Sequence, residues 1–316
     1  MTDDIKPPRI AVILPCYNED AAIGKTVRDF RAALPDAKVY VYDNNSKDRT
    51  AEVAREAGAI VRNEPRQGKG NVMRRMFADV EADIYVLADG DDTYDASVAP
   101  DLIRKLVSEE LDLVTGRRIH TAADAYRAGH VLGNKMLTGL TALMFGIELK
   151  DMLSGYRIMS RRFVKSFPFT AEGFGIETEL TVHAVRLLMP MAEVDTSYKE
   201  RPPGSVSKLS TYRDGFKILF TIAHLIREER PLFFFSTIAA LLVAVASILA
   251  YPLLIVFLHT HLVPRLPTAL LATALVIIAF LAVMSGFILD TVTRGRWESK
   301  RMAYLSFRGP QDRRNS

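Results

Sequence analysis

Two long apolar runs in the last third of the chain limit what it can fold into more than any other feature. Residues 232–258 and 268–289 contain no Asp, Glu, Lys or Arg, and each run exceeds the roughly 20 residues that a helix needs to cross a bilayer. The alternative, a pair of buried core helices, is rare at this length without a polar face. We therefore predict two transmembrane helices, in which Pro252 introduces at most a kink.

The charges around these runs predict their orientation. The short segment between them, residues 259–267, has Arg265 as its one firm charge, whereas residues 291–316 are rich in Arg and Lys. The positive-inside rule places such a basic segment in the cytoplasm. Because two crossings return the chain to its starting side, we expect a multi-pass protein of the inner (cytoplasmic) membrane, with its N-terminal domain and both termini in the cytoplasm.

The overall charge and the cysteine content narrow the class of protein. The formal net charge is +4, and the basic residues are concentrated beside the apolar runs. This distribution favours a membrane surface over nucleic acid as the binding partner of the basic residues. Cys16 is the single cysteine, so a disulfide framework and a cysteine-built metal site are excluded.

Residues 211–230, just before the first apolar run, have the pattern of an amphipathic helix. Five apolar side chains lie near one helical face: Phe216, Leu219, Phe220, Ala223 and Ile226. Such a helix is able to lie in the headgroup plane of a membrane, and we predict an interfacial helix here. The same pattern also suits a helix that packs against the core of the soluble part.

The chain before residue 210 alternates short β-branched runs with amphipathic stretches. Strands are expected at 9–14 (ended by Pro15), 38–42, 59–62, 83–88 and 111–115, and helices at 21–34, 49–57, 69–81 and 97–108. This alternation predicts an α/β fold with a mainly parallel sheet and helices on both faces. Ligands bind beyond the carboxyl ends of such strands, so the following loops are where functional residues are expected.

The loop after the fourth strand is the most acidic of these loops. Asp89, Asp91 and Asp92 lie within four residues, and carboxylates so close together repel one another unless a cation lies between them. Hard oxygen ligands suit Mg²⁺ or Mn²⁺. An acidic turn or helix cap is the alternative for an isolated pattern, but the position at a strand end favours a metal that bridges a diphosphate.

Two other nucleotide-binding patterns are missing or weak. Gly68-Lys69-Gly70 at a helix start suggests a phosphate cradle, but the Walker A pair of Lys followed by Ser or Thr is absent, because Gly70 and then Asn71 follow Lys69. No GxGxxG turn follows the first strand, which argues against a dinucleotide-dependent oxidoreductase.

Six motifs occur in a characteristic order: PCYNE at 15–19, DNNSKD at 43–48, GKG at 68–70, ADGDD at 88–92, GRR at 116–118 and DMLSGYR at 151–157. In order and spacing they closely resemble family 2 glycosyltransferases of the GT-A (Rossmann-like) fold. Within that family they resemble the polyprenyl-phosphate glycosyltransferases, a group that includes dolichol-phosphate mannose synthase and bacterial undecaprenyl-phosphate glycosyltransferases. The resemblance covers about residues 9–210.

The resemblance implies a role for each matching position. The nucleotide pocket is expected to contain Pro15, Tyr17, Asn18, Glu19, Asp43, Asn44, Lys69 and Asp89. The metal is expected on Asp89 and Asp91, and the acceptor phosphate on Arg117, Arg118, Arg201 and Lys208. Asp91, Arg117 and Asp151 are expected to act in catalysis.

Some of these roles stay open. Mannose synthases often continue DADLQ where this chain has Asp92-Thr93, so a third metal contact is undecided. Asp151 either orients the acceptor or supports the fold through Ser154 and Arg157. Glu177 and Glu179 face the sugar site by family position, and their roles are not fixed by the sequence.

The implied chemistry follows from the charges. A nucleotide diphosphate leaves the anomeric carbon while a lipid phosphate attacks from the opposite face, with inversion, and the metal acts as Lewis acid. Because a phosphate monoester has a second pKa of about 6, the acceptor is already anionic and needs no strong general base. The main task is to bring two anions together, for which arginines are suited.

The sequence therefore predicts inverting, metal-dependent transfer of a sugar from a nucleotide sugar to polyprenyl phosphate. A UDP-sugar is favoured and GDP-mannose is the alternative; the lipid-linked monosaccharide would serve cell-envelope glycan or glycolipid modification. The expected division is a GT-A domain at 1–210, the interfacial helix at 211–230, the spans at 231–290 and a basic tail at 291–316. Self-association into a homo-oligomer is left open.

Two other classes are weighed against this prediction. Arg296-Trp297 resembles the end of the QxxRW signature of processive polysaccharide synthases, but Thr293 stands where that signature has Gln. A non-catalytic membrane scaffold or translocator subunit would have no need for Asp43, Asp89 and Asp91 at successive strand ends.

Overall fold

The computed structural model describes residues 7–120, 139, 150–168, 175–199, 223–224 and 226–309. The chain forms two compact units. Met1–Gly215 together with Lys300–Ser316 make up the first, and Phe216–Ser299 make up the second.

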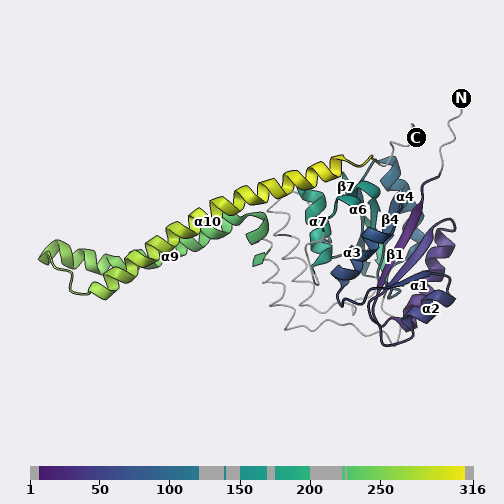
Figure 1. The fold of residues 1–316 in the computed structure, drawn as a ribbon, viewed down its shortest axis with the longest axis horizontal. Coiled ribbons are helices and arrows are strands. Elements are labelled where there is room, and N and C mark those ends of the chain that lie inside the picture. Colours follow the sequence, from purple (N-terminus) through teal and green to yellow (C-terminus); the bar gives the residue numbers. More distant parts are fainter. Residues whose placement is uncertain are drawn as a thin grey trace, which may run out of the picture. The chain divides into compact units, whose positions relative to one another are not determined.

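A seven-stranded sheet forms the centre of the first unit (Figure 1). Its strands are β1 Ile10–Cys16, β2 Lys38–Asp43, β3 Ile60–Asn63, β4 Ile84–Leu87, β5 Leu113–His120, β6 Arg157–Ser160 and β7 Met191–Tyr198, in the order β3-β2-β1-β4-β6-β5-β7. β6 is antiparallel to β4 and β5, and every other pairing is parallel. All strands but β6 therefore run the same way, which confirms the prediction of a mainly parallel sheet.

Helices cover both faces of this sheet, as predicted (Figure 1). They are α1 Asp20–Ala33, α2 Thr50–Glu56, α3 Lys69–Asp79, the 3-10 turn η1 Ala96–Val98, α4 Ala99–Ser108, α6 Arg161–Ser166 and α7 Ile176–Arg186. The two faces follow from alternation along β1. Val12 and Leu14 pack with α1, α2 and α4, while Ala11 and Ile13 pack with α3, α6 and α7.

Beyond β4 the sheet departs from the strand–helix alternation that the sequence predicted. β6, which the sequence did not indicate, lies between β4 and β5 and pairs Ser160 with Ile84 and Met159 with Leu113. Its four residues are all buried, so they lack the polar alternation that marks a half-exposed strand. β5 also begins at Leu113 and continues to His120, past the predicted end at residue 115, because β7 pairs with it along its whole length.

Pro15 does not end the first strand, contrary to the prediction. β1 continues through it to Cys16, and Pro15 is opposite Tyr42 in the register with β2. The carbonyl of Ile13 faces β4 and that of Cys16 faces β2, so Pro15 faces the β4 side, where the β1–β4 register has already ended at Ile13 and Leu87. Its missing N–H therefore breaks no ladder hydrogen bond.

The second unit contains two long apolar helices, α9 Pro231–Thr260 and α10 Leu266–Leu305. Both are long and apolar enough to span a membrane. Small buried residues recur every seven positions along them: Ala239 and Ala246 on α9, and Ala272, Ala279, Gly286 and Thr293 on α10. A Cβ on Gly286 would lie 3.3 Å from the Cα of Leu232, so the start of α9 packs closely against the later part of α10.

The large apolar side chains of these helices mostly point outward and are exposed, as expected for helices that meet lipid rather than a protein core. α10 continues as a helix to Leu305, beyond the predicted boundary at residue 290. Of the predicted interfacial helix, residues 223–224 and 226–229 are helical, and Arg230 caps the start of α9. Residues 211–222 and 225 lie outside the described residues.

Candidate functional site

The loops after β1, β2 and β3 lie side by side at the carboxyl edge of the sheet. Cys16 is in register with Asp43, and Asp43 with Asn63. The N–H of Asn44 donates to the carbonyl of Cys16 (2.8 Å), and the N–H of Glu64 donates to that of Asp43 (2.9 Å). The structure thus brings the predicted residues of segment 15–19 next to Asp43 and Asn44.

The loop after β1 is fixed to the loop after β2. Asn18 has a positive φ of 52°, its N–H donates to Ser46 Oγ (2.9 Å), and its Oδ1 accepts from the N–H of Lys47 (2.8 Å). The N–H of the buried Glu19 donates to Thr50 Oγ1 (2.8 Å). These bonds hold the two loops in one arrangement.

Asp43, at the carboxyl edge of the sheet, has one carboxylate oxygen without a hydrogen bond to the described residues. Its side chain is buried, and Oδ2 accepts from the N–H of Ser46 (3.2 Å). Oδ1 is buried and has no hydrogen-bond partner among the described residues. An unsatisfied buried acceptor costs about 1–3 kcal/mol, so this oxygen suits an N–H or O–H donor of a ligand.

Asn44 is occupied in positioning the loop that precedes α3. Its Nδ2 donates to the carbonyls of Glu64 (3.0 Å) and Arg66 (2.7 Å), and its Oδ1 accepts from the N–H of Gly68 (2.7 Å). Gly68 has a φ of 127°, which suits glycine. Asn44 therefore acts on the site by fixing the approach to Lys69.

The three carboxylates of the acidic loop have different surroundings. Asp89 is 30% exposed and accepts from Lys69, whereas Asp91 is buried and accepts from Thr93 Oγ1 (2.6 Å). Asp92, with a φ of 57°, forms an ion pair with Lys25 (2.9 Å). Asp92 is thus engaged with α1, and Thr93 with Asp91.

Lys69 links this loop to α7. Its Nζ lies 2.6 Å from Asp89 Oδ1 and 2.6 Å from Glu177 Oε1. Burial lowers the pKa of Lys69, but the two carboxylates outweigh burial and raise that pKa above its usual value. The ammonium group of Lys69 therefore pairs with two carboxylates, Asp89 in the loop after β4 and Glu177 on α7.

The DMLSGYR segment packs directly against Asp89. A Cβ on Gly155 would lie 2.5 Å from Asp89 Oδ2, so only glycine fits there without a shift. The N–H of Gly155 donates to the hydroxyl of Tyr94 (2.8 Å). Neither Gly155 nor Tyr94 was singled out from the sequence, because nothing local indicates that the two segments touch.

Arg157 is fully buried and holds the same segment to α7. It donates to the carbonyls of Met152 (2.7 Å), Ser154 (3.0 Å) and Glu177 (3.0 Å). Burial lowers its pKa to about 10, so it stays charged at neutral pH. Arg157 thereby fixes the backbone of Glu177, the second partner of Lys69.

Asp151 pairs with Arg118. The pair is bidentate, with Nε to Oδ2 at 2.8 Å and Nη2 to Oδ1 at 2.7 Å. Asp151 is buried, its N–H donates to Glu193 Oε1 (3.1 Å), and the guanidinium of Arg118 lies 5.7 Å from the centre of the Tyr198 ring.

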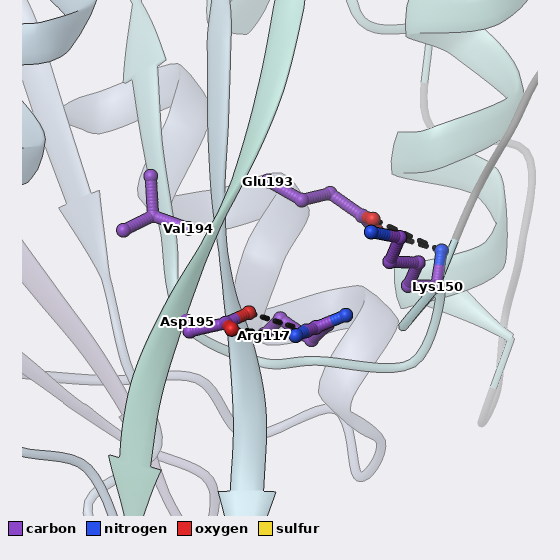
Figure 2. A pocket seen from close by; sticks show the side chains of 5 residues that line it. All are labelled: Arg117, Lys150, Glu193, Val194 and Asp195. Carbon is purple, nitrogen blue, oxygen red and sulfur yellow. Dashed lines mark hydrogen bonds and ion pairs between the residues drawn. The ribbon is translucent and has the colours of Figure 1, made fainter.

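Arg117 and Arg118 do not converge in this structure. They are consecutive residues of β5, so their side chains leave opposite faces of the sheet. Arg117 forms an ion pair with Asp195, which is opposite it on β7. Figure 2 shows this pair beside Lys150 and Glu193 in a hollow of about 400 Å³. Arg201 and Lys208 lie outside the described residues.

The acidic residues fit a metal that is held jointly with a ligand. Among the described parts of the chain, no group of three or more His, Cys, Asp or Glu side chains forms a self-sufficient metal site. The candidate ligands at the edge of the sheet are the two carboxylates of Asp89 and Asp91. Mg²⁺ and similar ions typically take one or two carboxylates and complete their shell with phosphate oxygens and water.

Comparison with known proteins gives a consistent assignment. Residues 11–167 match the family model described as glycosyl transferase family 2. Glycosyltransferase AglJ of Haloferax volcanii is 33% identical over 73% of this chain and 77% of its own length. A dolichyl-phosphate hexose transferase of the same organism is 29% identical over 70% of this chain and 95% of its length.

A solved structure of similar fold is the glucosyl-3-phosphoglycerate synthase of Mycobacterium tuberculosis in complex with Mn²⁺, UDP-glucose and phosphoglyceric acid. It has a TM-score of 0.53 and 25% identity, and the match covers 68% of this chain and 79% of that one. The GT-A fold predicted from the motifs is confirmed.

Proposed function

The chain belongs to glycosyl transferase family 2, and we propose that it transfers a hexose from a nucleotide sugar to polyprenyl phosphate with inversion at the anomeric carbon. That it is a glycosyltransferase follows from the family and from the named relatives, which leaves no support for a non-catalytic scaffold. The donor, the acceptor and the roles of individual residues are the proposal.

One observation is the main support for the proposed donor site. A buried, unpaired acceptor, Asp43 Oδ1, lies at the same edge of the sheet as Asp89 and Asp91. The nucleoside would donate to Asp43 from its base or ribose, with Pro15, Tyr17, Asn18 and Glu19 lining the pocket. A UDP-sugar is favoured because the mycobacterial neighbour of similar fold was solved with UDP-glucose; GDP-mannose is the alternative.

Asp89 and Asp91 would hold Mg²⁺ or Mn²⁺ together with the diphosphate. When bound, the ion would neutralise the charge that develops on the leaving diphosphate. Lys69, next to Asp89, would add a positive charge on the same side. Thr93 positions Asp91 through its hydroxyl, and Gly155 leaves room for Asp89.

The acceptor phosphate would be held by Arg118, Arg201 and Lys208, whereas Arg117 leaves the opposite face of β5 and would not contact the same phosphate. Arg118 is paired with Asp151, so a phosphate that reaches it would have to share the arginine with that carboxylate or replace it. Asp151 would then act by orienting Arg118, which lies close to Tyr198. The phosphate itself is the nucleophile.

A lipid acceptor is supported by two observations. One relative is named a dolichyl-phosphate hexose transferase, and the chain has two helices long and apolar enough to span a membrane. Because exposing an isoprenoid tail to water costs about 0.8 kcal/mol per CH₂, the enzyme has to meet the lipid at the bilayer. We propose that the catalytic unit is cytoplasmic and that residues 211–230 lie on the membrane surface.

A soluble phosphorylated acceptor is the second candidate. The mycobacterial neighbour was solved with phosphoglyceric acid, whose phosphate could meet the same arginines. The apolar helices favour the lipid over this candidate.

The test is product analysis with the full chain in nanodiscs. UDP- and GDP-hexoses are offered with Mg²⁺ or Mn²⁺ and with undecaprenyl phosphate or 3-phosphoglycerate, and products are identified by mass spectrometry. A lipid-linked hexose, lost in Asp91→Ala and retained in Asp92→Asn, is the expected result. Transfer to 3-phosphoglycerate alone would favour the second candidate, and equal transfer by wild type and Asp91→Ala would refute the proposed metal site.

A further inference from the structure

We propose that Lys69 is a tethered counter-ion of the donor site. In the ligand-free protein its ammonium group occupies the cation position at Asp89, and it moves aside onto Glu177 when the divalent ion arrives with the nucleotide. Lys69 would therefore make metal binding depend on the nucleotide. This inference rests on the proposed function and concerns the regulation of the same site.

The first support is the position of the ammonium group. Lys69 Nζ lies 2.6 Å from Asp89 Oδ1 and 2.6 Å from Glu177 Oε1. A divalent ion on that carboxylate would lie at about 2.0–2.2 Å from its oxygen, beside the ammonium group. Two cations a few ångströms apart in a partly buried site repel each other strongly, so both cannot share Asp89 in the observed geometry.

The second support is that the lysine is long and flexible while the backbone around its two partners is held. Gly155 packs closely against Asp89, since a Cβ there would lie 2.5 Å from Asp89 Oδ2. The backbone carbonyl of Glu177 accepts from Arg157 (3.0 Å) and from Thr181 Oγ1 (3.0 Å). Lys69 is the flexible partner, with a stem of four methylene groups that reaches Glu177 without any movement of the backbone of α3.

The third support is the balance of charge. Asp89, Glu177 and Lys69 together carry a net charge of −1, so removal of the lysine from Asp89 leaves a neutral Lys69–Glu177 pair and an Asp89 carboxylate ready for a metal. An incoming diphosphate adds negative charge close to both cations. A metal that binds alone is therefore repelled by the ammonium group, whereas the negative charge of the nucleotide offsets this repulsion. Binding of the metal and binding of the nucleotide are then positively linked.

The loop offers a matched control. Lys25 forms an ion pair with Asp92 (2.9 Å), on the same acidic loop, but Asp92 is directed toward α1. Removal of Lys25 changes the charge of the loop by the same amount without freeing Asp89. A general electrostatic effect on cation binding would appear in both lysine variants.

The test measures Mn²⁺ binding to the full chain in detergent micelles by electron paramagnetic resonance, with and without UDP, and with GDP in parallel. In the wild type we expect weak binding of Mn²⁺ alone and tighter binding with nucleotide. Lys69→Met should tighten binding of Mn²⁺ alone about tenfold and reduce the enhancement by nucleotide. Lys69→Arg, which keeps the charge, should resemble wild type, and so should Lys25→Met.

Glu177→Gln separates this role from direct metal ligation. It removes the alternative partner of Lys69, so Mn²⁺ alone should bind more weakly than to wild type. In the Lys69→Met background the same change should weaken Mn²⁺ binding by a smaller factor, because only the direct attraction of the Glu177 charge is then lost. An equal or larger loss in that background would make Glu177 a metal ligand and overturn the inference.

Failure of the inference is distinguishable from failure of the proposed function. If Lys69→Met leaves Mn²⁺ affinity unchanged while Asp91→Ala abolishes Mn²⁺ binding, the metal site stands and the counter-ion role is overturned. If Asp89→Asn and Asp91→Ala both leave Mn²⁺ binding unchanged, the proposed metal site is wrong and the inference falls with it.

Discussion

The hydroxyl of Tyr304, near the end of α10, donates to Oδ2 of Asp112 at 2.8 Å, although 192 residues separate them in the chain. Asp112 is fully buried just before β5 and also accepts from Ser160 Oγ (2.6 Å) and from Arg162 Nη2 (2.7 Å). The guanidinium of Arg162 lies 4.8 Å from the centre of the Tyr304 ring. The end of α10, from Lys300 onward, is thus a structural part of the first unit, which contains the sheet.

Tyr304→Phe should destabilise the catalytic unit by about 1–2 kcal/mol, because it removes a hydrogen bond to a buried carboxylate. The measurement is the thermal unfolding midpoint of the full chain in detergent. Tyr251→Phe changes an exposed tyrosine of α9 and serves as control. Equal midpoints for both variants would show that the Tyr304 contact contributes nothing.

Asp43→Asn should weaken nucleotide binding without lowering stability. The buried Oδ1 has no hydrogen-bond partner among the residues that the structure describes, so the protein itself loses little, whereas the ligand loses a charge-assisted hydrogen bond of about 1.5–3 kcal/mol. We expect a Kd for UDP or GDP raised about tenfold or more, measured by calorimetry. Asp48→Asn, which alters a carboxylate bonded to Thr50 at the start of α2, should affect stability and spare affinity.

Gly155→Ala should reduce turnover by at least about tenfold, because the new Cβ would lie 2.5 Å from Asp89 Oδ2 and displace that carboxylate. Even a shift of about 1 Å in a catalytic group is expected to cost up to 100-fold. Gly175→Ala is the matched control, since no other atom of the described residues lies within 4 Å of its Cβ position. Initial rates and Mn²⁺ affinity check both variants, and normal rates for Gly155→Ala would contradict the packing described.

The two arginines of β5 should differ in their effect on stability. Arg118→Ala leaves Asp151 buried without its bidentate partner, which is expected to cost about 3 kcal/mol. Arg117→Ala frees the more exposed Asp195 and should change stability little. If Arg118 holds the acceptor phosphate, Arg118→Ala should raise the KM for undecaprenyl phosphate more than Arg117→Ala does, and both variants should leave nucleotide affinity intact.

Acid should destabilise the catalytic unit through His183. This histidine is buried between Phe163 and Phe167, and burial lowers its pKa from 6.5 to about 3. The unfolded chain therefore binds a proton that the folded one does not, so stability is present above pH 6.5 and falls as the pH drops toward 3, by up to about 1.4 kcal/mol per pH unit.

The check compares denaturation midpoints between pH 7 and pH 5 for wild type and His183→Phe. The variant should lose part of the pH dependence, and His224→Phe, at an exposed histidine, should keep it. Identical slopes for wild type and His183→Phe would remove His183 as the cause.

The arrangement of the candidate site was partly predictable because parallel strands end at one edge. That rule places Asp43 and the segment after β1 together, and the register of Cys16 with Asp43 confirms this for β1 and β2. The apolar helices were predictable from length and charge alone. The strand ends and the apolar helices both follow from the local pattern of apolar and polar residues along the chain.

Contacts between distant segments were not predictable from such patterns. The buried strand β6 has no alternation, and nothing in the sequence near Lys69 or Glu177 indicates that they meet. The separation of Arg117 from Arg118 could have been inferred, because consecutive residues of a strand face opposite ways, but only once β5 was known to extend that far. The docking of Tyr304 depends on a tertiary contact with no local signal.

The contact between Tyr304 and Asp112 also orders events during synthesis. The ribosome makes residue 112 well before residue 304, and almost all of both apolar helices is made in between. The buried Asp112 therefore lacks its bond from Tyr304 until α9 and most of α10 have been synthesised. Completion of the first unit in this way has to wait for the apolar helices.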